Sequence, residues 1–260
     1  MGTVRGARVV VTGAGGGIGA ALARRFAAEG ARVVVNDLDA AKAASVAAEI
    51  GAVAVPGDAS AVVPGAREAL GGAIDVFCAN AGVAHGGGPE ADELVWERSW
   101  DVNVMSHVRA ARALLPEWLE RGSGRFVATV SAAGLLTMVG SAPYSVTKHA
   151  ALSFAEWLSA TYRHRGIAVH AVCPQGVRTD MLDATGAAGD LVLVPTAIEP
   201  EQVAEAVLKG IEDERFLVLP HPEVARYYAA RATETDKWLD GMNRVQRTLE
   251  EQRASGQAAD

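Results

Sequence analysis

The feature that most restricts the fold is a repeated alternation of short β-branched runs with longer alanine-rich stretches. Several short runs are almost wholly apolar, which is typical of parallel strands covered by helices on both faces. Gly30 and Gly51 follow two of the alanine-rich stretches, where glycine commonly ends a helix. The expected strands are RVVVT (8–12), RVVVN (32–36), AVAV (52–55), IDVFC (74–78), RFVATV (125–130), IAVHAV (167–172) and FLVL (216–219).

This alternation predicts an α/β fold, a doubly wound Rossmann-type sheet of seven parallel strands with helices on both faces. Helices are expected in a long segment around 89–120 and again over 142–164. No linker or repeat divides the chain, so residues 1–221 are predicted to form one domain. A helical tail is predicted to follow over 222–260.

The predicted tail carries one apolar face. Its apolar side chains recur at helical spacing, which indicates a helix that packs on the domain or on a sister subunit. They are Trp238, Met242, Val245 and Leu249.

Composition narrows the possible partners and the compartment. Half of the 260 residues are hydrophobic, enough for a sizeable core. The net charge of -7, without a run of Lys or Arg, argues against nucleic acid or an anionic membrane surface. Cys78 and Cys173 lie inside apolar runs and are expected to be buried thiols in a reducing compartment. With no signal-peptide core and no run of 18 apolar residues, a cytoplasmic location is expected.

The glycine-rich turn VVVTGAGGGIGAAL (9–22) lies between the first strand and the first helix. Glycines allow the backbone to approach a pyrophosphate, and the helix N-terminus supplies oriented N–H groups. No Lys-Ser/Thr pair follows, so the phosphate loop of ATPases fits poorly. A methyltransferase is also disfavoured, because an acid usually precedes its turn, where this chain has Val11 and Thr12. The turn therefore predicts a dinucleotide site.

Asp37 ends the second strand, eighteen residues past Gly19. A carboxylate there can accept hydrogen bonds from both adenosine ribose hydroxyls and would repel a 2′-phosphate. Neither Leu38 nor Gly16 offers a cation to offset that repulsion. NAD(H) is therefore predicted over NADP(H), with an ordinary surface aspartate as the alternative.

A tyrosine and a lysine four residues apart occur in SAPYSVTKHA (141–150). Tyrosine alone has a pKa of about 10, too high for efficient proton transfer near neutrality. Lys148 lies one helical turn from Tyr144, so its charge would favour tyrosinate and lower that pKa. The alternative is an ordinary surface pair at helical spacing.

Over about residues 7–220 the sequence closely resembles the short-chain dehydrogenase/reductase family. The residues that carry the resemblance are Thr12 to Gly19, Asp58, Asn80-Ala81-Gly82, Asn103, Ser131, Tyr144 to Lys148, and Pro174 to Thr179. The family implies an oxidoreductase that transfers a hydride between NAD(H) and a secondary alcohol or ketone, acting on CH–OH groups. It also implies a homotetramer or homodimer. The rival hypothesis is a non-catalytic NAD-sensing protein on the same fold.

The resemblance implies four catalytic residues. Tyr144 would be the acid/base, and Lys148 would tune it and bind the nicotinamide ribose. Ser131 would hydrogen-bond the substrate oxygen, with a strand-end cap as the alternative. Asn103 would hold a water in a proton relay, with a helix-bend residue as the alternative.

The resemblance also implies residues that contact the cofactor, and it implies no metal site. The residues are Gly13, Gly17, Ile18, Gly19, Asp37, Asp58, Ala59, Asn80, Tyr144, Lys148, Val177 and Thr179. Asn80 is equally explained as a turn-stabilising residue, and both roles can coexist.

The chain departs from the family pattern at three places. Ala79 replaces the first Asn of the usual Asn-Asn-Ala-Gly. Gln175 replaces the glycine after Pro174, so we expect it either to contact the substrate or to point to solvent. LPHPEVARYY (219–228) replaces the Asp-Gly-Gly that often follows the last strand, so the C-terminal subunit contacts are expected to differ.

The substrate is the least constrained part of the prediction. Residues 180–199 resemble a substrate lid, with small residues and glycines for hinging. His85 is expected to be solvated rather than to face the substrate. Side chains that would line an apolar pocket, or lie in the core, are Met138, Met181, Leu182 and Leu191.

Overall fold

The seven expected strands form one parallel sheet in the order β3-β2-β1-β4-β5-β6-β7. The computed structural model describes residues 4–185, 189 and 191–257. Each strand lies within two residues of its predicted bounds. The strands are β1 (Arg8–Val11), β2 (Arg32–Val35), β3 (Val53–Ala54), β4 (Val76–Ala79), β5 (Gly124–Thr129), β6 (Ile167–Val172) and β7 (Leu217–Val218).

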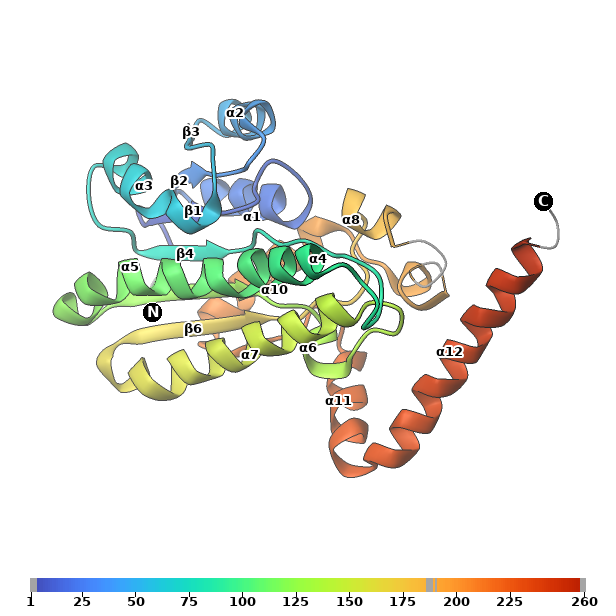
Figure 1. The fold of residues 1–260 in the computed structure, drawn as a ribbon. Helices are drawn as coiled ribbons and strands as arrows, with labels where there is room; N and C mark the ends of the chain where they lie inside the picture. Colours follow the sequence, from blue (N-terminus) through green and yellow to red (C-terminus); the bar gives the residue numbers. More distant parts are fainter. Residues whose placement is uncertain (1–3, 186–188, 190, 258–260) are drawn as a thin grey trace.

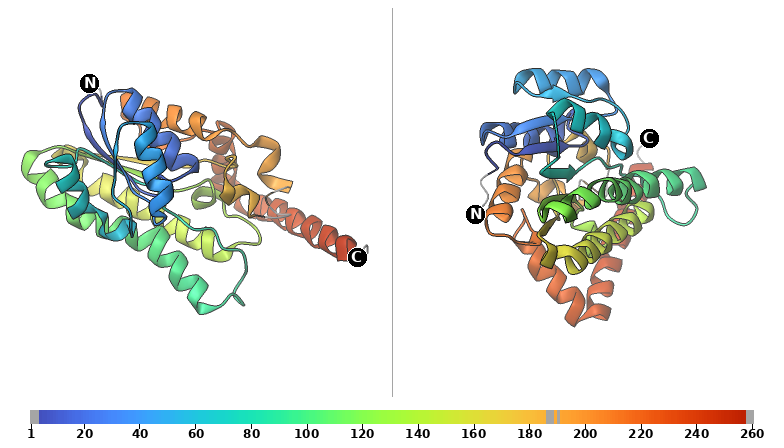
Figure 2. Two further views of the ribbon diagram at one scale, coloured as in Figure 1. Left: turned by 90° about the horizontal axis from the view of Figure 1, so that it is seen from above. Right: turned by 90° about the vertical axis from the view of Figure 1, so that its left-hand side faces the viewer.

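Helices cover both faces of this sheet, as predicted (Figure 1). One face carries α1 (Gly17–Ala28), α2 (Ala40–Glu49) and α10 (Pro200–Glu212). The other carries α3 (Val62–Leu70), α5 (Ser106–Arg121) and α7 (Ala142–Tyr162). Figure 2 shows the orange α10 running beside the blue α1. The sheet is therefore buried from both sides, which explains its nearly continuous apolar strands.

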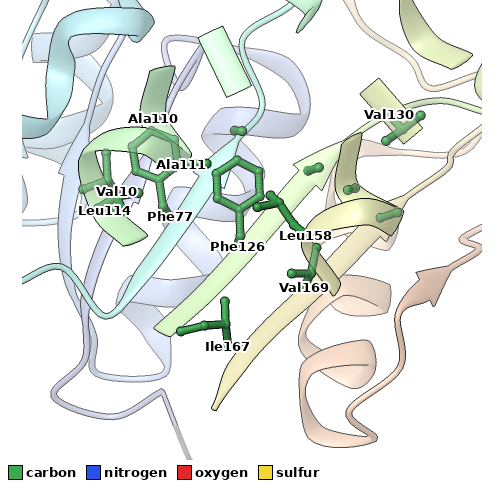
Figure 3. Close-up of a cluster of buried hydrophobic side chains, with 14 of the residues drawn as sticks. Val10, Phe77, Ala110, Ala111, Leu114, Phe126, Val130, Leu158, Ile167 and Val169 are labelled. Atoms are coloured by element: carbon green, nitrogen blue, oxygen red, sulfur yellow. The ribbon is translucent and has the colours of Figure 1, made fainter. Parts of the chain in front are cut away.

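Aromatic side chains fill the core beneath α5. Phe77 of β4 and Phe126 of β5 stack with ring centroids 5.9 Å apart (Figure 3). Leu114 of α5 and Leu158 of α7 are fully buried in the same cluster. Burying such side chains stabilises the fold by about 1.5–3 kcal/mol each. This packing holds α5 and α7 against the strands.

The long helical segment expected around 89–120 is interrupted, which corrects that prediction. It consists of α4 (Glu93–Trp100), a π-helical turn (Asp101–Met105) and α5. The side chain of Asp92 caps α4 by accepting a hydrogen bond from the N–H of Leu94. The π turn falls at Asn103, one of the predicted catalytic residues.

The tail folds as two helices, α11 (Glu223–Thr233) and α12 (Thr235–Gln257), where one was expected. Arg231 of α11 bonds the carbonyl of Leu135 and lies 3.0 Å from His149 Nε2, which ties α11 to α6 (Ala133–Leu136) and α7. Leu249 is buried, and the other residues of the apolar face predicted for the tail are half-buried. Figures 1 and 2 show α12 projecting away from the sheet.

Three short elements lie near the carboxyl edge of the sheet. They are a 3-10 turn at Ala59–Ala61, α8 (Asp180–Asp183) and a 3-10 turn at Val194–Thr196. The predicted lid at 180–199 includes residues 186–188 and 190, which lie outside the described residues. None of the helices in the described part of the chain is long and apolar enough to cross a membrane.

Candidate active site

The loops that carry the predicted site residues meet at one edge of the sheet. Because all seven strands are parallel, their carboxyl ends share that edge. β1 and β4 are neighbours there, although β2, β3 and their helices separate them in sequence. The sheet order reverses between these two strands, which makes this point the usual place for a ligand crevice.

The glycine turn packs directly against the end of β4. Gly13 has a φ of 60°, and a Cβ there would lie 2.8 Å from Ala81 Cα, so only glycine fits. Asn80 Nδ2 donates to the carbonyls of Thr12 and Gly13 at 3.0 and 3.2 Å. Asn80 therefore stabilises the turn, which is the structural one of the two roles that the sequence analysis gave it.

The N-terminus of α1 is left open by the glycine turn. Gly16 precedes the helix in an extended conformation, and no side chain caps it. The first turn of α1 carries no acidic residue, and a Cβ at Gly16 would meet nothing within 4 Å. Unpaired N–H groups beside open space suit an anionic group such as a pyrophosphate.

The loop after β6 also lies beside the glycine turn. A Cβ at Gly17 would lie 2.9 Å from Thr179 Cγ2, so Thr179 touches the glycine turn. Thr179 Oγ1 donates to the carbonyl of Val177 at 3.1 Å. The predicted contacts at Gly17 and Thr179 are therefore adjacent.

Asp37 faces the glycine turn from the end of β2. Its Oδ2 accepts the N–H of Gly15 at 2.9 Å, and its Oδ1 accepts the N–H of Asp39 at 3.0 Å. The carboxylate is thus held in place with lone pairs to spare. Lys42 lies close by, since a Cβ at Gly15 would be 2.7 Å from Lys42 Cβ. The sequence argument overlooked this cation, whose Nζ lies 3.8 Å from Asp180 Oδ2.

The loop after β3 lies at the same edge of the sheet, where Asp58 and Ala59 are predicted to contact the cofactor. Asp58 is exposed, and its Oδ1 accepts the N–H of Ser60 at 2.8 Å, which starts the 3-10 turn at Ala59. The other carboxylate oxygen has no recorded partner. Asp58 and Ala59 therefore lie at the predicted edge.

Tyr144, Lys148 and Ser131 converge at the end of β5. The Ser131 hydroxyl hydrogen-bonds to the Tyr144 hydroxyl. Lys148 is buried, its Nζ donates to the carbonyl of Thr129 at 3.1 Å, and it lies 5.6 Å from the centroid of the Tyr144 ring. Ser131 has a φ of 149°, a conformation rare for non-glycine residues and typical of functional sites. Two hydroxyls and an ammonium group thus share one corner of the edge.

Asn103 lies beside this corner. It is fully buried, and its Nδ2 donates to Thr147 Oγ1 and to the carbonyl of Val83, both at 3.0 Å. A Cβ at Gly82 would lie 3.2 Å from Asn103 Oδ1 and 3.3 Å from Lys148 Nζ. The two polar atoms therefore border the same small space.

The model of the short chain dehydrogenase family matches residues 7–189, most of the chain. The chain belongs to the short-chain dehydrogenase family. It is 37% identical over 232 residues to a 1-deoxy-11-beta-hydroxypentalenate dehydrogenase of Streptomyces exfoliatus, covering 82% of each chain.

Solved structures of other short-chain dehydrogenases share the fold. One from Burkholderia phymatum, in complex with NAD, has a TM-score of 0.83 and 27% identity, covering 91% of this chain and 96% of that one. Another from Sphingobium yanoikuyae, in complex with NADPH, has a TM-score of 0.74 and 29% identity, with coverages of 90% and 94%.

Tyr144 differs from the sequence prediction in its pKa. In this short-chain dehydrogenase burial raises the pKa of Tyr144, and the hydrogen bond from Ser131 only partly opposes this effect. Burial also lowers the pKa of Lys148 to about 8. The predicted lowering of the tyrosine pKa is therefore not found, because desolvation disfavours both charged forms.

Gln175 does not point freely into solvent. Its backbone N–H donates to His221 Nδ1 at 3.1 Å, and its Nε2 lies 3.4 Å from the carbonyl of Val192 and from Thr196 Oγ1. Gln175 Oε1 is buried without a recorded hydrogen-bond partner. The carboxamide therefore faces residues 192–196, the end of the predicted lid.

The other pocket candidates have separate positions. Leu182 is buried in α8, whereas Met181 and Leu191 are 41% and 36% exposed, so only the latter two could readily contact a ligand. Met138 is half-buried. His85 is also half-buried and lies with its Nδ1 3.0 Å from Ser99 Oγ, so the expected solvated histidine has a protein partner instead.

The two cysteines are free and buried, as predicted. Burial raises the pKa of the Cys78 thiol, and it raises that of Cys173 to about 12. Both are therefore unreactive thiols. No group of three or more metal-ligating side chains occurs among the residues that the structure describes.

His107 of α5 is a buried titratable group that the sequence argument missed. Neither ring nitrogen has a recorded partner, and Phe126 packs edge-on against the ring. Burial, with a smaller contribution from the Lys148 charge, lowers the pKa of His107 to about 3. His107 is thus neutral in the folded chain at physiological pH.

This lowered pKa predicts a loss of stability in acid. An unfolded histidine binds a proton below about pH 6.5, whereas folded His107 does not until about pH 3, so stability falls as pH decreases through that window. We expect His107→Leu to reduce the loss in unfolding free energy between pH 7 and pH 5 by about 2 kcal/mol. Urea denaturation at both pH values measures this difference. An unchanged loss, matching that of the exposed-site control His164→Leu, would contradict it.

Proposed function

We propose that this chain is an NAD(H)-dependent oxidoreductase that interconverts a secondary alcohol and a ketone. The observation that carries the proposal is the convergence of Ser131, Tyr144 and Lys148 beside the glycine turn. The Streptomyces relative supports the reaction class, since its name specifies a dehydrogenase of a hydroxylated compound.

In the proposed mechanism Tyr144 exchanges a proton with the oxygen of the substrate. In the reducing direction its hydroxyl gives a proton to the carbonyl oxygen of the substrate, and in the oxidising direction its phenolate takes one back. Ser131 lies within hydrogen-bonding reach of the same hydroxyl and donates to the substrate oxygen. A nicotinamide cofactor, when bound, supplies or accepts the hydride.

Lys148 stabilises the phenolate through its charge and connects the tyrosine to Asn103. The space between Lys148 Nζ and Asn103 Oδ1, beside Gly82, is lined by a donor and an acceptor. A water held there would link the buried lysine to further proton carriers. Asn103 is thus assigned a positioning role in the proton path.

Three features at the edge of the sheet support a dinucleotide site. The open N-terminus of α1 suits the pyrophosphate, and the loop at 174–179 suits the nicotinamide end through Val177 and Thr179. Asp37 and Asp58 face the adenosine end from the loops after β2 and β3. NAD(H) is proposed over NADP(H) because the Asp37 carboxylate would repel a 2′-phosphate.

A screen of ketones and alcohols with each of the four nicotinamide cofactors tests the proposal, with absorbance at 340 nm as the readout. We expect turnover with NAD(H) that exceeds turnover with NADP(H). No turnover across the panel, combined with tight NADH binding, would instead support a non-catalytic NAD-sensing protein.

Gln175 gives a prediction about the substrate. Its Oε1 is buried and lacks a hydrogen-bond partner among the described residues, and a donor on the substrate would supply one if it displaced the neighbouring chain. We expect Gln175→Gly to lower kcat/KM for hydroxylated ketones by about 10-fold relative to apolar ketones of equal size. An unchanged ratio between the two ketone classes would contradict a role in the pocket.

A homo-oligomer is proposed as well. Large apolar side chains of α4 and α7 are exposed on the described surface, and such residues are often covered in assemblies. Leu94 is 70% exposed and Trp157 is 54% exposed. Light scattering coupled to size-exclusion chromatography measures the assembly, and a monomer at micromolar concentration would contradict it.

A further inference from the structure

Three chain segments meet at the side chain of His221. This residue is 2% exposed and lies in the turn after β7, two residues before α11 begins. Its Nδ1 lies 3.1 Å from the backbone nitrogen of Gln175, and its Nε2 lies 3.2 Å from the carbonyl oxygen of Thr196. One imidazole thus bridges the loop after β6 and the segment that precedes α10.

The partners of His221 determine which of its ring nitrogens donates and which accepts. The backbone N–H of Gln175 can only donate, so Nδ1 must accept and carries no proton. The carbonyl of Thr196 can only accept, so Nε2 must carry the proton. The two bonds together therefore assign Nδ1 as the acceptor and Nε2 as the donor.

Residues 192–198, here the crossing segment, are also bonded directly to the loop after β6. Ile198 N donates to the carbonyl of Gly176 at 3.1 Å, and Arg178 N donates to the carbonyl of Ile198 at 2.9 Å. Gly176 lies so close to the carbonyl of Leu193 that no side chain could fit there.

The carboxamide of Gln175 adds a second connection to the crossing segment. Its orientation follows from the carbonyl of Val192, which can face only the NH2 group. That group also lies 3.4 Å from Thr196 Oγ1. His221 and Gln175 thus both contact the crossing segment, and they share Thr196 as a partner.

We propose that His221 and Gln175 form a clasp that positions the 174–179 loop for the nicotinamide end of the cofactor. The proposal rests on the proposed function, which assigns that loop to nicotinamide. Both residues stand where the sequence departs from the pattern of the short-chain dehydrogenase family. The clasp therefore lies at the two places where this sequence departs from the pattern that the resemblance implies, the glycine after Pro174 and the residues after β7.

The clasp acts on one half of the cofactor site only. The adenosine half is formed by the loops after β2 and β3, where Asp37 and Asp58 bond to their own loops. No recorded hydrogen bond joins those loops to His221 or Gln175. Loss of the clasp should therefore weaken ligands that carry nicotinamide and spare those that end at the second ribose.

Binding of NADH and of ADP-ribose to the full chain tests this selectivity. In His221→Phe, which keeps a ring but removes both hydrogen bonds, we expect the Kd for NADH to rise about 10-fold. The Kd for ADP-ribose should change less than about 2-fold. His221→Gln, which retains a donor and an acceptor, should recover part of the loss. His164→Phe, an exposed-site control, should leave both Kd values unchanged. Equal weakening of the two ligands, or of neither, would overturn the clasp.

Hydrogen exchange followed by mass spectrometry separates the clasp from the proposed function. In His221→Phe we expect peptides covering 191–199 to exchange faster than in His164→Phe, while the β5 peptide stays unchanged. An equal acceleration in both peptides, or none, would overturn the clasp even if NADH binds. If neither NADH nor ADP-ribose binds the wild-type chain, the proposed function fails, and this exchange pattern still decides the clasp.

A double variant checks that the two residues act together. Gln175→Leu removes the carboxamide bonds and leaves the backbone N–H that His221 accepts. If both residues fix one crossing segment, the double variant should weaken NADH binding by less than the product of the single effects. Effects that multiply would show two independent sites and contradict the clasp.

Discussion

Tyr144→Phe is expected to lower kcat by about 1,000-fold or more, because the variant keeps the ring and removes the only proton that the proposed mechanism transfers. Binding of NADH should change less than about 2-fold, since the hydroxyl interacts with Ser131 and has no contact with the glycine turn among the described residues. Steady-state kinetics at 340 nm and fluorescence titration with NADH measure the two quantities separately.

Tyr162→Phe is a matched control for this variant. Tyr162 ends the same helix, α7, and packs edge-on against Trp157, away from the candidate active site. The control should keep wild-type kcat. Turnover retained in Tyr144→Phe would refute the proposed mechanism, whatever the control does.

Asp37→Asn is expected to shift the preference from NADH toward NADPH by about 100-fold in the ratio of kcat/KM values. Asparagine keeps an acceptor for the N–H of Gly15 but removes the charge that would repel a 2′-phosphate. Two charges about 4 Å apart near a protein surface interact by about 4 kcal/mol, so even partial relief produces a large shift. Lys42 lies beside Gly15, and its positive charge would add attraction for that phosphate.

Asp39→Asn controls for the change in net charge. Asp39 lies two residues further on and caps α2 by accepting the N–H groups of Ala41 and Lys42, a role that asparagine also fills. Its variant should leave the NADH to NADPH ratio within about 2-fold of wild type. An unchanged ratio in Asp37→Asn would mean that this carboxylate does not select the cofactor.

Much of the fold followed from local pattern. β6 has its predicted bounds, because only His170 interrupts its apolar run and Gly166 ends the preceding turn with a φ of 81°. The interruption of the 89–120 helix could not be predicted in this way. It coincides with bonds from Asn103 to Val83 and Thr147, residues 20 and 44 positions away, which no local pattern reveals.

The candidate site likewise contains some residues that local sequence patterns reveal and others that they do not. Tyr144 and Lys148 could be found because their spacing is local, and Asp37 because it ends an obvious strand. His221 could not, since its partner is a backbone N–H 46 residues away. The raised pKa of Tyr144 was also missed, because desolvation depends on everything packed around the ring.

The π-helical turn at Asp101–Met105 acts as a change of phase within one long helix. A π turn holds one residue more than the α-helical turn it replaces, so every later side chain is rotated by about 100°. The side chains of α5 are therefore rotated about the helix axis relative to those of α4, before the π turn. This rotation directs Leu114 and Trp118 into the core. Deleting Val102 would restore a regular helix. In that helix either Asn103 or the core side chains of α5 could keep their positions, but not both. A single-residue deletion here should therefore damage the chain far more than the loss of one valine side chain would suggest.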